Sequence, residues 1–555
     1  MKKSLITRQW LTLTLALLLV SNFSFAQFIQ LSEEEAACTS IMVGKLATAD
    51  GSVITAHSCD GNYRTWLNIM PHKKYTPGAT RKVIWGTMHT EGPWDLRNLI
   101  EKGEIPQVAE TFSYLNVCYP ALNEKQLAFG ETTIGGRREL TNDDGLFLIE
   151  ELQRIALERC SSAREAIKLM GELAEKFGYG DDGECLTVAD KKEVWHFEIM
   201  GAGLTYKSAV WAAVRIPDDH VGVSANIPRI STLDLAKPDY YMASKNVISL
   251  ATELGFFDPK KGEPFKFWKA YGGRTKAFSI REFYVLSTMA PSLKLSMDVD
   301  ELPFSVKPDA KVGVRDVLKY YRVTYEGTEY DATKNLMVKG FARRGQPAAE
   351  GETPPLVKSN LANPFMSSDL VNLVNTLKPG TIQGQRTIAI SGCSYSQVIQ
   401  CRDWLPDEIG GVAYFSFDNP GESPRIPIYS GTLSLPANFE NCGQKRYRED
   451  SGVWQFRRTN RLAEIKWGVT RKFIEEGVKR YEDRVFAEQQ SIDKVAVELY
   501  NAEKGKEPQL DERGNPKPAK YREFLTKYTN DFARAAMNEW WEMGNNFFTM
   551  FARGL

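Results

Sequence analysis

The chain has 555 residues, of which 43% are hydrophobic and 25% charged, a composition typical of a globular protein with one large domain or two ordinary ones. Lysine plus arginine and aspartate plus glutamate both total 70, so the net charge at pH 7 is zero. That balance gives no electrostatic case for nucleic acid or an anionic membrane as a partner, and it favours a small neutral substrate.

The first 26 residues have the pattern of a signal peptide. They are basic at Lys2 and Lys3, apolar from Trp10 to Val20 and small at Ala26, where we expect cleavage. The apolar run is too short for a comfortable membrane span, and no other stretch is long and apolar enough to be one. We therefore expect an exported protein, periplasmic or secreted, without stable membrane insertion.

Residues 27–37 separate this leader from Cys38. They contain three consecutive glutamates and no periodic apolar pattern, so we interpret them as a propeptide. A lipid-anchored cysteine is the alternative, but it needs a leucine-like residue three positions upstream and an adjoining apolar run. Position 35 is a glutamate, which argues against the lipid anchor.

Cleavage before Cys38 would give one residue both a thiol and a free α-amine. A thiol is partly ionised near neutral pH, and a terminal amine with a pKa of roughly 7.7 to 8 can carry its proton. The sequence therefore predicts Cys38 as a nucleophile that activates itself. Taken alone, a cysteine at the start of a strand is more often a small buried hydrophobe.

From Cys38 to about residue 230 the pattern predicts short strands around one pair of helices. Asp50-Gly51 favours a tight hairpin turn between the first two strands. Strands followed by helices and then strands indicate the α+β class. The expected strands are 39–43, 52–56, 83–85, 127–131, 186–189, 194–199 and 221–224, and the expected helices are 145–160 and 162–177.

No pattern in the chain predicts a cofactor or a metal. Residues 178–183 match the dinucleotide fingerprint G-x-G-x-x-G, but a helix precedes them, so we expect Gly178 to cap that helix and the glycines to form a turn. Metal-ligand spacings such as Cys-x-x-Cys do not occur. The eight cysteines are too sparse for a disulfide scaffold, although export would permit a bridge or two.

Beyond residue 450 the chain becomes charge-rich and helical in pattern, over 454–503 and again over 521–551. In the last helix, Phe524, Tyr528, Phe532, Ala536 and Trp540 form an apolar stripe at four-residue spacing. We expect the stripe to pack on the preceding domain or on a second copy of the chain, which leaves a homo-oligomer open. Residues 451–555 are thus predicted to be a helical extension.

Several blocks of the sequence, in order, resemble the C69 family of cysteine dipeptidases in the N-terminal nucleophile hydrolase superfamily. The run from Cys38 to Ser52 is similar to the opening of that family's mature chain. The later blocks are 123–127, 130–133, 195–199, 211–220, 224–226, 325–328, 386–388 and 427–431. The resemblance covers the chain from about Cys38 to Gly431, and several ordered blocks are more specific than one motif.

By this resemblance the fold would be a four-layer αββα sandwich with Cys38 at the end of a strand, in a catalytic domain of residues 38–450. The sulfur of Cys38 would attack the carbonyl of Ala37 and release the propeptide, and the same thiolate would then cleave dipeptides through an acyl-enzyme. The resemblance implies an exported, self-processing cysteine dipeptidase that acts on small dipeptides without a cofactor.

The resemblance also suggests partners for Cys38. Related amidases carry an Arg-x-x-Asp pattern soon after the nucleophile, and here Asp60 is kept while His57 stands where the arginine would be. A histidine would make the electropositive help to the thiolate pH-dependent. Asn226 is similar to the asparagine that donates its amide N–H to the oxyanion. Structural alternatives are a turn carboxylate for Asp60, a packing role for His57 and a turn cap for Asn226.

Weaker candidates complete the set. Thr132 or Thr133 would supply a second oxyanion donor, and Arg281 a distant supporting charge. Cys59 is expected to be a bystander or a disulfide partner. Two other functions stay open: an amidase or acylase acting on N-acyl amino acids or penicillin-like amides, and a secreted binding module on an inactive hydrolase scaffold.

Overall fold

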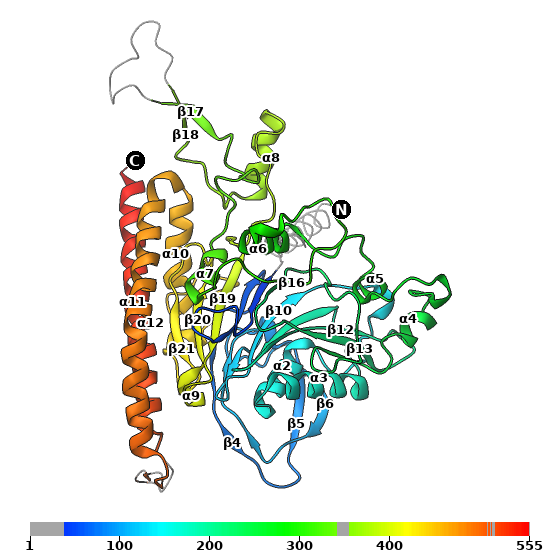
Figure 1. The fold of residues 1–555 in the computed structure, drawn as a ribbon. Coiled ribbons are helices and arrows are strands. Elements are labelled where there is room, and N and C mark those ends of the chain that lie inside the picture. Colours follow the sequence, from blue (N-terminus) through cyan, green and yellow to red (C-terminus); the bar gives the residue numbers. More distant parts are fainter. Residues whose placement is uncertain (1–37, 341–354, 508, 511, 513–516, 554–555) are drawn as a thin grey trace, which may run out of the picture.

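The computed structural model describes residues 38–340, 355–507, 509–510, 512 and 517–553. The expected signal peptide and propeptide, residues 1–37, lie outside the described residues. The described part combines antiparallel sheets with helices, which confirms the α+β class (Figure 1).

The first large sheet has seven strands and contains the strand that follows Cys38. Each neighbouring pair is antiparallel. In spatial order the strands are β16 (Ser305–Val306), β14 (Val221–Ser224), β1 (Thr39–Val43), β2 (Val53–Asp60), β19 (Cys393–Cys401), β20 (Val412–Phe417) and β21 (Ile426–Tyr429). The strand β1 is therefore an interior strand with a neighbour on each side.

The second large sheet has eight strands, also antiparallel throughout. In spatial order they are β15 (Tyr241–Ala243), β13 (Ala209–Arg215), β12 (Val194–Gly201), β11 (Glu184–Ala189), β10 (Ala128–Thr133), β9 (Leu122–Asn123), β8 (Tyr114–Asn116) and β3 (Asn68–Met70). Three two-stranded ribbons are separate: β4 (Lys73–Lys74) with β7 (Glu110–Thr111), β5 (Thr80–Trp85) with β6 (Ile100–Pro106), and β17 (Met337–Lys339) with β18 (Leu356–Lys358).

The two large sheets face each other. Strands β1 and β2 of the first contact β10 and β11 of the second. Hydroxyl groups link them: Thr55 and Thr187 share a hydrogen bond of 2.6 Å between their Oγ1 atoms, and Ser40 Oγ donates to the Glu131 carbonyl at 3.0 Å. Buried polar groups therefore lie between the sheets, and these hydroxyl groups are satisfied across them.

Helices contact the sheets on either side. Helices α2 and α3 contact strands of the eight-stranded sheet, whereas α6, α7, α10 and α12 contact strands of the seven-stranded sheet. Their bounds, with those of the other α-helices described, are α2 (Ile149–Arg159), α3 (Ala163–Phe177), α4 (Ser249–Glu253), α5 (Phe267–Gly272), α6 (Ile280–Met289), α7 (Val314–Tyr320), α8 (Ser368–Leu377), α9 (Asp407–Gly410), α10 (Gly452–Glu464), α11 (Trp467–Glu503) and α12 (Lys520–Ala552).

Each of the expected strands and helices of residues 38–230 is present. Strands β1 and β14 have the expected bounds, and Ser162 caps α3 in a capping box with Glu165. Gly178 ends that helix with a φ of 87°, as predicted. The prediction ended the second strand at residue 56, but β2 continues to Asp60, because its polar end is buried and paired on both sides by β1 and β19.

The C-terminal segment forms three helices rather than two. The expected helix over 454–503 is divided at Ile465 and Lys466 into α10 and α11, while α12 matches the last expected helix (Figure 1). In α12, Phe532, Ala536 and Trp540 are buried, and the helix contacts α10, α11 and β21. The apolar stripe thus packs within the chain. No helix among the described residues has the length and apolarity needed to cross a membrane.

Candidate functional site

Cys38 immediately precedes β1 and is 2% exposed. The register of β1 and β2 pairs Thr39 with Ser58, so Cys38 and Cys59 are the next residues along the two strands. Cys38, Ser40 and His57 project into the space between the sheets, because alternate residues of a strand point to the same face. The candidate nucleophile therefore lies at the end of an interior strand, in a closed part of the molecule.

Arg281, in the first turn of α6, contacts Cys38 directly. Its Nη1 donates to the Cys38 carbonyl at 2.6 Å and to Thr39 Oγ1 at 3.0 Å. Its Nη2 donates to the Ala225 carbonyl at 2.9 Å and to Asn226 Oδ1 at 3.0 Å. The sequence predicted a distant supporting charge, and that was wrong: one guanidinium joins the end of β1 to the loop after β14.

Burial lowers the pKa of Arg281 to about 10, and the positive charge of the nearby Arg386 adds to this effect. The side chain still carries its proton at neutral pH. A capping box between Ser279 and Glu282 begins α6, so this local pattern fixes the helix start that presents Arg281.

Asp60, the last residue of β2, is buried and paired with Arg386. Nη2 of Arg386 donates to Asp60 Oδ2 at 2.8 Å, and Ser58 Oγ donates to the same oxygen at 3.2 Å. The other carboxylate oxygen, Oδ1, has no hydrogen-bond partner among the described residues. Sequence reasoning assigned no role to Arg386, although it lies in one of the quoted blocks.

His57 is buried and uncharged. Burial lowers its pKa to about 3, although the hydrogen bond to the Glu131 backbone opposes the shift. Its Nδ1 lies 2.7 Å from the Glu131 carbonyl oxygen, and within the described chain its Nε2 has no partner. The expected pH-dependent positive charge at this position is therefore absent near neutral pH, and Arg281 and Arg386 provide the positive charge nearby.

Asn226 has a left-handed backbone with a φ of 64° and points its side chain at two partners. Its Oδ1 accepts from Arg281, and its Nδ2 donates to the Thr133 carbonyl at 2.7 Å. An amide nitrogen has two N–H groups, so one remains for another acceptor. Arg281 thus connects Asn226 with Cys38. The hydroxyl of Thr132 bonds Ser224, and that of Thr133 donates to the Glu131 carboxyl at 3.4 Å.

Glu131, in the middle of β10, adds a carboxyl group to the site. The sulfur of Cys38, a ring nitrogen of His57 and a carboxyl oxygen of Glu131 all lie within 4.8 Å of one another, and all three residues are buried. These are donor types that bind zinc, so the trio could also hold a cation. Sequence reasoning gave Glu131 no role; an acidic residue inside an otherwise apolar strand was the available clue.

Other thiols surround the nucleophile. All eight cysteines are free. Burial raises the pKa of Cys59 well above its usual value, and the neighbouring thiols of Cys118 and Cys38 raise it further. Burial and the nearby Asp60 carboxylate similarly raise the pKa of Cys393. The thiols of Cys59 and Cys393 therefore remain protonated near neutral pH and are poor nucleophiles.

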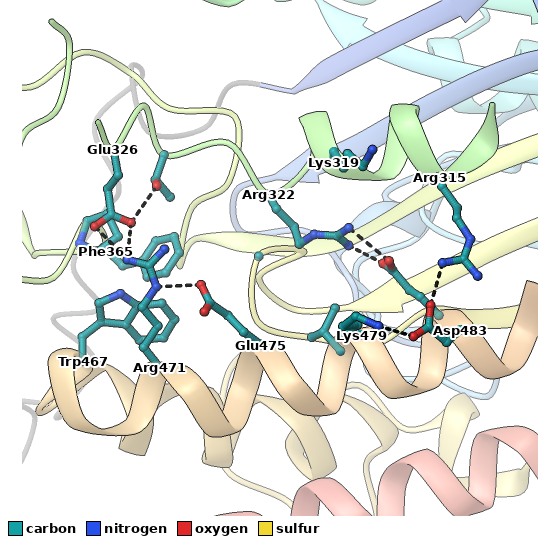
Figure 2. Close-up of a pocket in the computed structure, with 15 residues that line it drawn as sticks. Arg315, Lys319, Arg322, Glu326, Phe365, Trp467, Arg471, Glu475, Lys479 and Asp483 are labelled. Carbon is teal, nitrogen blue, oxygen red and sulfur yellow. Dashed lines mark hydrogen bonds and ion pairs between the residues drawn. The ribbon is translucent and has the colours of Figure 1, made fainter. Parts of the chain in front are cut away.

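A cavity of about 470 Å³ lies elsewhere, between α7 and α11. Figure 2 shows Arg471, Glu475, Lys479 and Asp483 along one face of α11, with dashed lines between opposite charges. We call this region the ion-pair cavity; its other charged lining residues are Arg315, Lys319, Arg322, Glu326 and Glu482. Each of these side chains forms an ion pair within the described chain.

The ion-pair cavity is connected to the site through one loop. Arg471 of α11 pairs with Glu326 at 2.9 Å, and the adjacent Tyr325 donates its hydroxyl to the Arg386 carbonyl at 3.1 Å. Arg386 in turn binds Asp60. Helix α11 therefore supports the loop that holds the arginine of the site.

Comparisons with known proteins point to one family. The model of the family described as peptidase family C69 matches residues 37–480. A probable dipeptidase of Salmonella dublin is 26% identical over 414 residues, which cover 71% of this chain and 81% of that protein. A probable dipeptidase of Latilactobacillus sakei is 26% identical over 430 residues (74% and 78%), and dipeptidase A of Lactobacillus helveticus is 20% identical over 454 residues (79% and 84%).

Proposed function

Because the chain belongs to peptidase family C69, we propose that it is a self-processing dipeptidase whose nucleophile is the N-terminal thiol of Cys38. The observation that carries the proposal is the contact of Arg281 with the Cys38 carbonyl at 2.6 Å. The same guanidinium holds Asn226, so the nucleophile and an amide donor are fixed relative to each other. The names of the relatives support dipeptides as the substrate class.

Self-processing would use the thiol first. The sulfur attacks the carbonyl carbon of Ala37, the bond from that carbon to the Cys38 nitrogen breaks, and the nitrogen leaves with a proton as a free amine. Water then hydrolyses the thioester and releases residues 27–37. The unpartnered Oδ1 of Asp60 is a suitable acceptor for the new ammonium group, because a buried carboxylate oxygen without a donor costs free energy.

Dipeptide cleavage would repeat this chemistry. The amine takes the thiol proton, the thiolate attacks the scissile carbonyl, and the second residue of the dipeptide leaves as a free amino acid after it accepts that proton. The remaining N–H of Asn226 would stabilise the oxyanion. Water then cleaves the thioester, releases the first amino acid and restores the thiol. With a pKa of about 3, His57 is too weak a base for these steps near neutral pH.

We also propose the order of the layers in the fold and the cellular location of the protein. The helix contacts on either side of the paired sheets support a four-layer αββα sandwich of the N-terminal nucleophile hydrolase type, with residues 38–450 as the catalytic domain and 451–555 as a helical extension. The leader pattern of residues 1–26 supports export to the periplasm or the medium. The fold type and the cellular location do not depend on the dipeptide chemistry.

The intact mass of the exported protein tests self-processing, measured for the wild type and for Cys38→Ala. We expect the wild type to begin at Cys38 and the variant to retain residues 27–37. If both begin at Gln27, the N-terminal nucleophile mechanism fails. A panel of dipeptides and N-acyl amino acids then tests the substrate class: preferential cleavage of N-acyl amino acids would replace the dipeptidase with an amidase.

A further inference from the structure

The buried carboxyl group of Glu131 has no cationic side chain paired with it among the described residues. Its side chain is fully buried, and its Oε2 has no hydrogen-bond partner among the described residues. Glu184, on the neighbouring strand β11, is a second buried acid with an unpartnered Oε2. In the part of the chain that the structure describes, neither carboxylate forms an ion pair with a lysine, an arginine or a histidine.

Two buried aspartates of the molecule, in contrast, are neutralised by arginines. Asp60 pairs with Arg386 at 2.8 Å, and Asp418 pairs with Arg457 at 2.6 Å. A buried carboxylate without a partner is costly, and such a group holds a proton instead. Accordingly, burial raises the pKa of Glu131 well above its usual value, and so does the nearby Cys38 thiol. Burial raises that of Glu184 too, as does the charge of Glu131.

The Glu131 carboxyl lies close enough to the Cys38 sulfur to contact the amino group of a dipeptide attacked by that sulfur. Its oxygen is within 4.8 Å of the Cys38 sulfur. In an aminoacyl group the α-nitrogen is two bonds from the carbonyl carbon that the sulfur attacks. A carboxylate that binds this nitrogen at about 2.8 Å can lie up to roughly 7 Å from the sulfur, given ordinary bond lengths, so the observed separation is within reach of such a contact.

The surroundings of the carboxyl also suit an ammonium group. The ring of His57 lies 5.8 Å from that of Tyr119, which lies 5.6 Å from the ring of Tyr63. Tyr63 is the partly exposed member of this row. Aromatic faces attract ammonium groups, so the row offers a favourable approach for a cationic substrate.

We propose that Glu131, with Glu184 behind it, is the receptor for the α-ammonium group of the substrate's first residue. The inference rests on the proposed dipeptidase function and adds the reason for its selectivity: a free α-amine supplies a cation that the Glu131 carboxylate does not find among the described residues. On binding, the Glu131 carboxyl releases its proton to solvent, and the ammonium group becomes the positive partner of the resulting carboxylate. An N-acyl substrate has no such charge and would leave the site unneutralised.

The test compares a dipeptide with its analogue lacking the α-amine, in the wild type and in Glu131→Gln. The probe pair is L-alanyl-L-alanine and propionyl-L-alanine, or the equivalent pair for whichever dipeptide is cleaved fastest. For the wild type we expect kcat/KM to favour the dipeptide by about 10³-fold or more, since a site built to bind a substrate N–H rejects the analogue without it. In Glu131→Gln the value for the dipeptide should fall about 10- to 100-fold, while that for the analogue stays within a few-fold.

Glu150→Gln is the matched control. Glu150 is another fully buried acid, and its two oxygens have no partner within the described residues, but it belongs to α2 and is outside the trio around Cys38. We expect this variant to keep the wild-type preference for the free amine. The intact mass of Glu131→Gln should still be that of a chain beginning at Cys38. The bond between Ala37 and Cys38, which is cleaved in processing, has no free α-amine beside it.

Several outcomes would overturn the inference. Equal losses on both substrates would make Glu131 a general contributor to the reaction, and an unchanged preference would mean that another group binds the amine. A Glu131→Gln protein that retains residues 27–37 would place Glu131 in processing instead. If the wild type cleaves neither substrate of any pair, the proposed function itself fails and the inference falls with it.

Discussion

Two charged regions of this molecule are built in opposite ways. In the ion-pair cavity, charged side chains of α7 and α11 meet in opposite pairs, many of them partly exposed. Around Cys38, the polar groups are fully buried, yet three of their atoms lack partners among the described residues: Nε2 of His57, Oδ1 of Asp60 and Oε2 of Glu131. The charges of the ion-pair cavity are thus paired with one another, whereas the buried groups around Cys38 keep unpartnered atoms within the described residues.

This difference distinguishes charged groups that stabilise the fold from charged groups that bind a ligand or take part in a reaction. A satisfied ion pair at a surface contributes about 0 to 1 kcal/mol and needs no ligand. An unsatisfied buried polar atom costs roughly 1 to 3 kcal/mol, so three in one place are a substantial local cost. A ligand with complementary groups can recover that free energy when it binds. The following variants test this distinction.

Cys38→Ala should abolish dipeptide hydrolysis, with a loss of at least about 10⁴-fold in kcat, because no remaining group can form the thioester. The residue is a small buried side chain, so we expect the midpoint of thermal unfolding to change by only a few degrees. Steady-state kinetics and calorimetry measure the two effects. Activity within tenfold of the wild type would remove Cys38 from the mechanism.

Arg281→Lys keeps the charge and removes the forked geometry. A lysine ammonium cannot reach the Cys38 carbonyl and Asn226 at once, as the guanidinium does. We expect kcat to fall about 10²-fold with a smaller change in KM, since misplacing the reacting groups slows the chemical step. Steady-state kinetics of the processed protein measure kcat and KM separately. A change in KM alone would show that Arg281 contributes to substrate binding instead.

Arg322→Met breaks a pair in the ion-pair cavity. Its partner Glu482 is 8% exposed and would be left without this guanidinium. We expect the unfolding free energy to fall by about 1 to 2 kcal/mol, which is less than for a fully buried pair because Arg322 is partly exposed. We expect kcat to stay within about twofold of the wild type. Urea denaturation and kinetics check this. A large fall in kcat without a loss of stability would contradict the structural role of the cavity.

His57 gives the unfolding free energy a dependence on pH. Its pKa is about 3 in the folded protein and about 6.5 when exposed, so the unfolded state binds more protons between these values. Stability should therefore fall as the pH drops below 6.5, by about 1 kcal/mol at pH 5.5 from this group. In His57→Gln that part of the slope should disappear. Denaturation curves at pH 5.5 and 7.5 for both proteins measure it; identical slopes would mean that His57 is accessible to protons.

Sequence patterns predicted the helices and strands that are determined by residues adjacent in the chain. Strand β1 and helix α3 were predicted because short apolar runs, a hairpin turn and a capping box are encoded in adjacent residues. The division between α10 and α11 was missed, since neither residue at Ile465 and Lys466 breaks a helix by itself. The extension of β2 to Asp60 was missed because polar residues were expected outside the sheet.

The site was predictable only in part, for a related reason. Cys38 could be found because the leader and propeptide patterns stand directly before it in the chain. Arg281 lies 243 positions from Cys38, and Arg386 lies 326 positions from Asp60, so their contacts exist only after the sheets and α6 have packed. Glu131 reaches Cys38 from the opposite sheet. No spacing in the sequence reports such contacts.

The most direct test of the account is covalent labelling of the processed protein with alanyl chloromethyl ketone, which carries a free α-amine and alkylates a reactive thiol. Peptide mapping by mass spectrometry would locate the adduct among the eight cysteines. We expect one adduct, on Cys38, and we expect excess dipeptide to suppress it. An unmodified Cys38, or an adduct on Cys59 or another cysteine, would contradict it.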